Sequence, residues 1–291
     1  MRILLTVPHY FKPQGNGRYG STQPNPQPRL AALTQLLRNL HTIYAAPQEH
    51  WVRVGDHLQP YAVDQATSLT LDVVICTSQD DHLLTQLVLP PNLYEQRRTA
   101  CNPMLLGFEC HDILREQLDH YDLFGYLEDD LILHDPGFFN KLHHFVQVAG
   151  EASLLQPNRF ERYATLAQLK KVYIDFEFQP ASSVPETAQT ITLQSCGYAV
   201  ECCRATNAHA GCFFLTQAQL ARWVAQPSFG LRDTSYIGPL ESAATLGIMR
   251  TFQIYKPAPR YANFLEVEHF GQLWSRKLGA VRFPASTRSP S

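Results

Sequence analysis

Three consecutive carboxylates, Glu128-Asp129-Asp130, end an apolar and aromatic-rich segment that begins at Tyr121. We call these three residues the acidic cluster. Adjacent acids repel one another, and stability alone gives no reason to place them at the end of a buried strand. A hard divalent cation gives such a reason, because carboxylate oxygens are the ligands that Mg²⁺ and Mn²⁺ prefer. The alternative interpretation is an acidic turn that is solvated at the surface.

The segments around the acidic cluster alternate between apolar strand patterns and helical periodicity, which predicts an α/β fold. We expect a mixed, mostly parallel sheet with helices on both faces. Ligands of such sheets bind outside the carboxyl ends of the strands, where the acidic cluster is expected to lie. Strands are predicted at 3–7, 71–77, 121–127, 152–155, 172–178, 191–193, 211–215 and 250–255, and helices at 29–44, 102–121, 217–225 and 240–246.

The composition is that of a folded globular protein, with 45% hydrophobic residues, 17% charged residues and a net charge of -2 among 291 residues. No basic stripe is present, so nucleic acid is not expected as a partner. Neither a signal peptide nor a transmembrane segment is recognisable. The seven cysteines are scattered without a CxxC pair, which favours reduced thiols and a cytoplasmic location. Peripheral contact with a membrane stays open.

No composition shift marks a linker, so a single domain is predicted over residues 1–281, followed by a flexible Pro/Ser/Thr-rich tail at 282–291. The loop at 12–28 is long for a compact domain, and it is either a lid or binding loop or a disordered segment. Arg18 and Arg29 border this loop and are candidates to contact phosphate. The segment 15–20 is a poor version of a Gly-rich phosphate loop, which disfavours a nucleotidyltransferase.

The acidic cluster, with its apolar strand before it and the helix start at 135–139 after it, resembles the metal- and sugar-nucleotide-binding motif of the GT-A glycosyltransferases. The similarity is greatest to the inverting N-acetylglucosaminyltransferases that build N-glycans. Three further segments resemble elements of this family in the same order along the chain. They are Ser78-Gln79-Asp80 after a strand, the apolar strand at 211–215, and the late His-Gly element at 266–271.

The resemblance implies a GT-A, Rossmann-like fold that binds a nucleotide-sugar, with UDP as the expected nucleotide, in residues 1–135 and an acceptor in residues 136–281. It implies that Glu128 hydrogen-bonds the ribose, that Asp129 supports the donor, and that Asp130 holds Mn²⁺ or Mg²⁺. His269 would be a further ligand, and an imidazole ligand favours Mn²⁺. Asp80 would contact the uracil ring.

The end of the first strand, Pro8-His9-Tyr10, does not match the family pattern. Pro8 and Tyr10 are nevertheless predicted to contact the nucleotide, because Tyr10 follows the strand where a base would stack. The resemblance does not carry the acceptor over, and we expect a glycan or a lipid-linked saccharide that receives a hexosyl or N-acetylhexosaminyl group.

An inverting transfer needs a base that takes the proton of the acceptor hydroxyl. Glu241 is the first candidate, because it opens a predicted helix and precedes Lys256-Pro257 at about the spacing that the family shows. An acid at a helix start also serves the helix dipole, which is the structural alternative. Asp233 is the second candidate. Two other functions stay open: a nucleotidyl- or phosphoryl-transferring metalloenzyme, and a non-catalytic carbohydrate-binding protein on the same scaffold.

Overall fold

A computed structural model describes residues 1–14, 19–45, 48–63, 69–165, 168–175, 189–195 and 197–277. Arg18, most of the glycine-containing segment at 15–20 and the predicted tail at 282–291 lie outside the described residues. Within the described ranges, no helix is long and apolar enough to cross a bilayer. The six cysteines in these ranges are free thiols.

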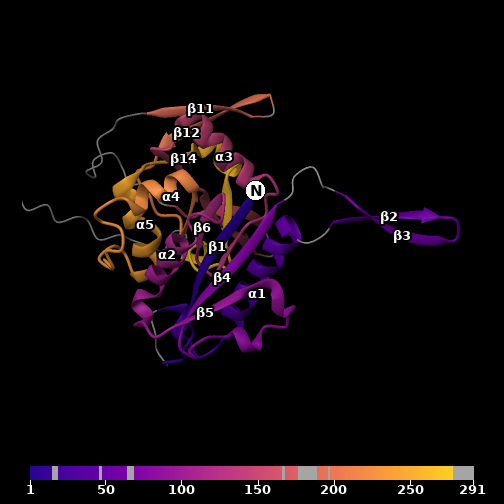
Figure 1. Ribbon diagram of the computed structural model, residues 1–291, viewed down its shortest axis with the longest axis horizontal. Coiled ribbons are helices and arrows are strands. Elements are labelled where there is room, and N and C mark those ends of the chain that lie inside the picture. The colour runs from indigo at the N-terminus through magenta and orange to yellow at the C-terminus, as the bar shows by residue number, and fades with distance from the viewer. Residues whose placement is uncertain are drawn as a thin grey trace, which may run out of the picture.

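A five-stranded sheet forms the centre of the molecule, with the strand order β13-β6-β1-β4-β5 (Figure 1). Neighbouring strands run parallel except for β13, which is antiparallel to β6 at one edge. The predicted α/β class with a mixed, mostly parallel sheet is therefore confirmed. The strands are β1 (Arg2–His9), β4 (Thr70–Ser78), β5 (Glu95–Thr99), β6 (Leu123–Leu127) and β13 (Cys212–Thr216).

Helices cover both faces of this sheet, because successive side chains of a strand point to opposite faces. In β1, Leu5 packs with helices α1 and α3 on one face, and Leu4 packs with α2, α4 and α5 on the other. Each face therefore has its own apolar core. The helices are α1 (Gln27–Leu40), α2 (Leu106–Glu116), α3 (Phe138–Ala149), α4 (Gln217–Val224) and α5 (Pro239–Thr251).

Two smaller sheets extend the molecule beyond the central one, with the orders β10-β9-β15-β7 and β11-β12-β14-β8. Strand β15 pairs with both β7 and β9, and this pairing places His269 opposite Leu131, the residue after the acidic cluster. Their strands are β7 (Leu131–Ile132), β8 (Ser153–Leu155), β9 (Asn158–Ala164), β10 (Leu169–Tyr173), β11 (Thr190–Ser195), β12 (Tyr198–Arg204), β14 (Gln253–Pro257) and β15 (Glu266–His269).

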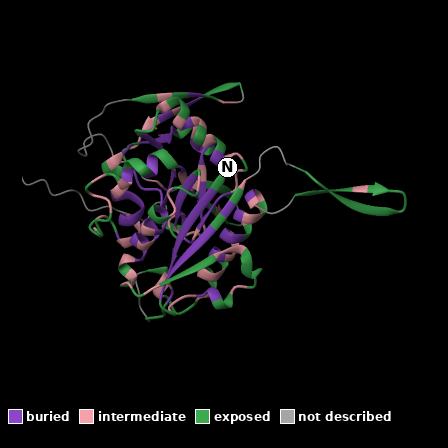
Figure 2. Cartoon of the chain, in the orientation of Figure 1, coloured by how far each residue is buried: buried purple, intermediate pink, exposed green. Residues whose placement is uncertain are grey.

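A two-stranded hairpin, β2 (Glu49–Val54) and β3 (His57–Ala62), projects from the body of the molecule (Figure 1). Its residues are exposed along almost their whole length, including Trp51 and Tyr61 (Figure 2). This hairpin is not predicted from the sequence, and neither are β5 and β9. These segments carry many polar and charged side chains and lack the apolar pattern on which strand prediction depends.

Polar side chains cap the first turns of two helical segments. Asn102 accepts a hydrogen bond from the backbone N–H of Met104 at 3.0 Å, as expected for a cap. Thr216 and Gln219 form a capping box at the start of α4. The helix predicted at 102–121 is shorter, because it begins with a 3₁₀ turn and α2 ends at Glu116. The short helical turns are Gly20–Thr22, His41–Ala45, Leu84–Gln86, Pro91–Leu93, Pro103–Leu105, Pro259–Phe264 and Ser275–Lys277.

Gly247 of α5 packs against the buried indole ring of Trp223 from α4, and a Cβ atom added at Gly247 would lie 2.4 Å from a ring carbon. Alanine favours a helix over glycine by about 1 kcal/mol, whereas overpacking a core costs about 1–3 kcal/mol. We expect the clash to dominate, so Gly247→Ala should lower the free energy of unfolding measured in urea. Gly20→Ala is the control, since nothing lies within 4 Å of a Cβ atom there. A gain in stability at position 247 would contradict the packing argument.

Candidate functional site

The three carboxylates of the acidic cluster point in different directions where β6 ends. Side chains two residues apart along a strand point to the same face, so Asp129 points to the same side as Leu127, which packs on the α1 side of the sheet. Its Oδ2 lies 2.6 Å from Nδ1 of His9, at the end of the neighbouring strand β1, and its Oδ1 lies 2.5 Å from Nη2 of Arg29. The side chains of His9 and Asp129 are completely buried. Asp129 therefore joins β6, β1 and α1 inside the protein.

The tautomer of His9 follows from its two partners. The backbone N–H of Leu83 donates to Nε2 at 3.1 Å, so Nδ1 carries the proton and donates to Asp129. Burial alone would raise the pKa of Asp129, but Arg29 and the His9 hydrogen bond outweigh it and hold this pKa below its usual value. Asp129 is thus an internal anion that orders its neighbours, and its oxygens are already engaged.

Asp130 lies between a guanidinium and an imidazole. Nη1 of Arg29 donates to its Oδ2 at 3.0 Å, and Nε2 of His269 lies 3.8 Å from the same oxygen. Its Oδ1 is buried and accepts no hydrogen bond from the described residues. A buried acceptor without a partner is unusual in a folded protein and needs an explanation, such as an ion.

His269 is oriented by a buried carboxylate. Its Nδ1 lies 2.9 Å from Oε1 of Glu161. The carboxylate of Glu161 also accepts from two backbone N–H groups, that of Trp274 at Oε1 and that of Ser275 at Oε2. Burial would raise the pKa of Glu161, but these hydrogen bonds outweigh it and hold the pKa at about 2. Since Glu161 is an anion, Nδ1 of His269 donates to it, and Nε2 faces Asp130. A carboxylate behind a histidine is the usual support of a metal-binding imidazole.

Glu128, the first residue of the acidic cluster, lies within reach of the charge of Glu241. Burial, followed by the charges of Asp130 and Glu241, raises the pKa of Glu128 well above its usual value. Oε1 of Glu128 is buried without a hydrogen-bond partner in the described ranges, and Oε2 packs on Gly211, where an added Cβ atom would lie 3.0 Å from it. Gly211 has a φ of 65°, which favours glycine. The charge of the predicted base, Glu241, therefore acts on the predicted ribose contact, Glu128.

Two cations from the two smaller sheets, Arg159 of β9 and Lys256 of β14, pair with one carboxylate. Nε of Arg159 donates to Oδ1 of Asp175 at 2.8 Å, and Nζ of Lys256 donates to Oδ2 at 2.7 Å. The three side chains are between 8% and 11% exposed, so this is a buried ion triad. Burial alone would raise the pKa of Asp175, but Lys256 and Arg159 outweigh it and hold the pKa at about 2. The charge of Arg159 also reaches Glu128.

The structure does not bring all the predicted residues together. Asp80 follows β4 at the same edge of the sheet, but its side chain is 79% exposed and accepts from Arg98 at 2.8 Å. Pro8 is buried within β1, and Tyr10 packs partly on the α2 side of the core.

Asp233, the second candidate base, is engaged elsewhere. It accepts from the backbone N–H of Ser235 at 2.9 Å and from Arg250 at 2.7 Å. The Ser235 and Arg250 hydrogen bonds lower its pKa to about 2, which makes it a weak base.

Sequence reasoning missed four contributors to the site, namely His9, Arg159, Glu161 and Asp175. Arg29 is a candidate phosphate contact from the sequence, and the structure shows it paired with two acids of the chain. The only sequence signal for this pairing was a basic residue in the first turn of a helix, where the helix dipole disfavours a cation.

The described residues contain no group of three or more His, Cys, Asp or Glu side chains that could hold a metal ion. Asp130 and His269 supply two candidate ligands, so a cation here would need further ligands from a bound molecule or from water. Such partial coordination is usual for Mg²⁺ at phosphate-binding sites.

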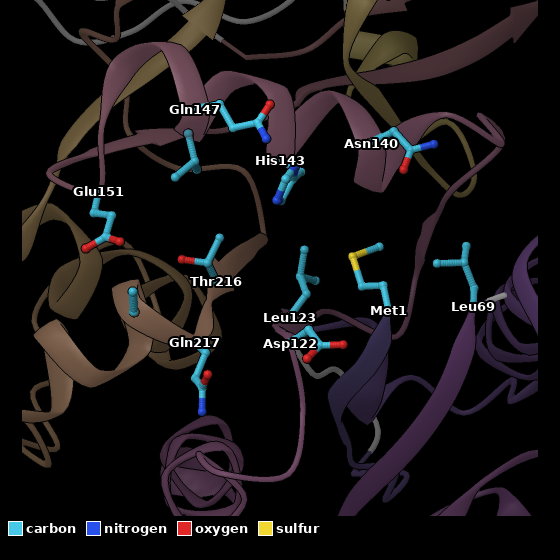
Figure 3. A pocket seen from close by; sticks show the side chains of 12 residues that line it. Met1, Leu69, Asp122, Leu123, Asn140, His143, Gln147, Glu151, Thr216 and Gln217 are labelled. Atoms are coloured by element: carbon cyan, nitrogen blue, oxygen red, sulfur yellow. The ribbon is translucent and has the colours of Figure 1, made fainter. Parts of the chain in front are cut away.

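A cleft of about 800 Å³ lies at the amino edge of the sheet, opposite the acidic cluster. It is lined by the start of β6, by α3 and by the start of α4, with Asp122, His143 and Gln217 among its side chains (Figure 3). None of the predicted site residues lines it.

The fold and the site define an α/β protein whose carboxylates gather at the carboxyl edge of a mostly parallel sheet. No protein-family model and no curated protein matches the chain. Among solved structures, S. aureus TarS is 12% identical with a TM-score of 0.45, and the match covers 94% of this chain but only 37% of TarS. A protein from Desulfovibrio desulfuricans G20 assigned as a nucleotide-diphospho-sugar transferase is 10% identical with a TM-score of 0.39, covering 92% of this chain and 79% of that one. Likeness at this level is too remote to assign a family or an activity.

Proposed function

We propose that this protein is a glycosyltransferase that moves a sugar from a nucleotide-sugar, with UDP as the nucleotide, to a hydroxyl group of a glycan or lipid-linked saccharide. One observation carries the proposal. Two buried carboxylate oxygens, Oε1 of Glu128 and Oδ1 of Asp130, have no hydrogen-bond partner among the described residues and lie at the carboxyl edge of the sheet. They fit a ligand that brings a cation and hydroxyl donors, as a metal-bound nucleotide-sugar does.

Asp130 and His269 fit a divalent cation as two of its ligands. The 3.8 Å separation between Oδ2 and Nε2 is too long for a hydrogen bond, so the two side chains do not bond to each other and would both be able to hold a cation. Oxygens of the diphosphate and water would complete the coordination, and a mixed oxygen and imidazole set favours Mn²⁺ over Mg²⁺. When bound, the cation neutralises the negative charge that develops on the departing diphosphate.

The groups around the cation have separate roles in this proposal. Glu128 accepts hydrogen bonds from the ribose, and Asp129 supports the donor indirectly by holding His9 and Arg29. Tyr10 and Pro8 contact the nucleotide base at the end of β1. Asp80 reaches the uracil ring if it leaves Arg98, which an exposed ion pair allows at small cost.

Glu241 acts as the base of an inverting transfer. Its carboxylate takes the proton of the acceptor hydroxyl while the acceptor oxygen bonds to the anomeric carbon, and the bond from that carbon to the diphosphate breaks. The electron pair leaves with the nucleoside diphosphate. In this arrangement residues 1–135 supply the nucleotide side of the site and residues 136–281 supply Glu241 and His269, as expected for one domain with two functional halves.

Calorimetric titration of UDP tests the proposal. We expect binding in the presence of Mn²⁺, and we expect loss of that binding with EDTA or in Asp130→Asn, because the variant removes the charge of a ligand while keeping its shape. Asp56→Asn is the control, since Asp56 lies in the exposed hairpin turn. Equal UDP binding with EDTA and in Asp130→Asn would refute the metal role. Absence of UDP binding in every condition would refute the uridine donor.

A further inference from the structure

Arg29 occupies the place where a cation would meet the acidic cluster. Its Nη2 lies 2.5 Å from Oδ1 of Asp129, and its Nη1 lies 3.0 Å from Oδ2 of Asp130. That second oxygen is the one that faces Nε2 of His269. The proposed metal ligand is therefore already paired with an internal positive charge.

The position of Arg29, taken without its two carboxylate partners, would lower the stability of the fold. It lies in the first turn of α1, where the helix dipole disfavours a cation, and its side chain is only 15% exposed. Its Nε is buried and has no hydrogen-bond partner among the described residues. The two carboxylates offset this cost, and without Arg29 they would be neighbouring charges in a poorly solvated place.

A divalent cation that binds the free protein meets two obstacles. Among the described residues it finds only two candidate side-chain ligands, and one of them, Asp130, is shared with a guanidinium that repels it. A diphosphate removes both obstacles, because its oxygens add ligands and its negative charge compensates the extra positive charge.

We propose that Arg29 is an internal counter-ion that keeps the cation site closed in the free protein, so that a divalent cation and a nucleoside diphosphate bind together. Arg29 stays anchored on Asp129 when the cation engages Asp130, and its released Nη1 donates to a phosphate oxygen. The inference rests on the proposed function and makes Arg29 a positioning residue of the metal site.

Titration of Mn²⁺, followed by the loss of the paramagnetic resonance signal of free Mn²⁺, tests the inference without an activity assay. The wild-type protein should bind Mn²⁺ weakly alone and at least about tenfold more tightly with UDP. Arg29→Gln should bind Mn²⁺ alone about tenfold more tightly than the wild type, because the competing charge is gone. By linkage, the gain in Mn²⁺ affinity that UDP provides should then shrink.

Two control variants separate charge from position. Arg29→Lys keeps the charge and should leave Mn²⁺ binding without UDP as weak as in the wild type. Arg38→Gln makes the same chemical change at an exposed residue in the last turn of the same helix, and it should leave Mn²⁺ affinity unchanged.

Unchanged Mn²⁺ affinity in a folded Arg29→Gln variant, with UDP still strengthening Mn²⁺ binding in the wild type, would overturn the inference and leave the proposed function standing. Tight binding of Mn²⁺ to the wild type without UDP would also overturn it, and this result does not depend on how the variants fold. No binding of Mn²⁺ to the wild type even with UDP would overturn both the inference and the metal role.

Discussion

Glu241→Gln is expected to lower the rate of sugar transfer by about 10²–10⁴-fold, the usual range for a lost general base. UDP and Mn²⁺ binding should stay unchanged, because Glu241 belongs to α5 and contacts neither Asp130 nor His269 in the described hydrogen bonds and ion pairs. The measurement pairs the initial rate of transfer from the preferred UDP-sugar with calorimetric titration of UDP.

Two glycines, Gly238 and Gly211, allow the carboxylates of Glu241 and Glu128 to lie close to the backbone. The Glu241 carboxylate packs on Gly238, where an added Cβ atom would lie 2.5 Å from Oε2, just as Glu128 packs on Gly211. Both carboxylates are thus held close to the backbone, and the charge of Glu241 reaches Glu128. In the proposed function, a base in this place would face the sugar of a donor whose ribose Glu128 would hold.

Two further variants make the Glu241 prediction specific. Asp233→Asn should retain most activity, because Asp233 is already engaged by Arg250 and Ser235. Gly238→Ala should lower the transfer rate while keeping the Glu241 carboxyl group, since the new methyl group displaces it. Full activity of Glu241→Gln together with inactivity of Asp233→Asn would transfer the role of base to Asp233.

The parts of the fold that local patterns encode were predictable. The apolar runs of β1, β4 and β6 and the cap at Thr216 depend on neighbouring residues only, and the acidic cluster ends its strand as expected. The helix expected at 240–246 extends further, from Pro239 to Thr251, and Gly247 within it packs on Trp223. Tertiary contact here overrides propensity.

The partners of the acidic cluster could not be predicted, because they depend on pairings between distant segments. Glu161 meets His269 only because β9 runs parallel to β15, more than one hundred residues later in the chain. Asp175 lies just after β10, which runs antiparallel to β9, and this pairing brings it to Arg159. Neither segment has a sequence motif that predicts an ion pair. A polar strand such as β9 shows its function only once its neighbours are known.

Asp175→Asn is expected to lower the free energy of unfolding by about 3–5 kcal/mol, the usual cost of removing one partner from a buried ion pair. The variant leaves Arg159 and Lys256 buried without their shared carboxylate, although the carbonyl oxygen of His209 still accepts from Lys256 at 2.8 Å. Urea unfolding followed by circular dichroism measures the loss. The expected loss is a large part of the free energy of unfolding of an ordinary domain, which is about 5–15 kcal/mol.

The triad offers its own controls. Lys256→Met should cost less than Asp175→Asn, because Asp175 keeps Arg159, and the double variant should be more stable than the sum of the two losses predicts.

The pKa of Asp175 is about 2 in the folded protein and its ordinary value is 3.8, so the stability that it contributes is present above about pH 4 and is lost as the pH falls toward 2. Asp175→Asn should therefore lose less stability than the wild type between pH 4 and pH 2. A cost below about 1 kcal/mol would show that the triad is solvated like a surface ion pair.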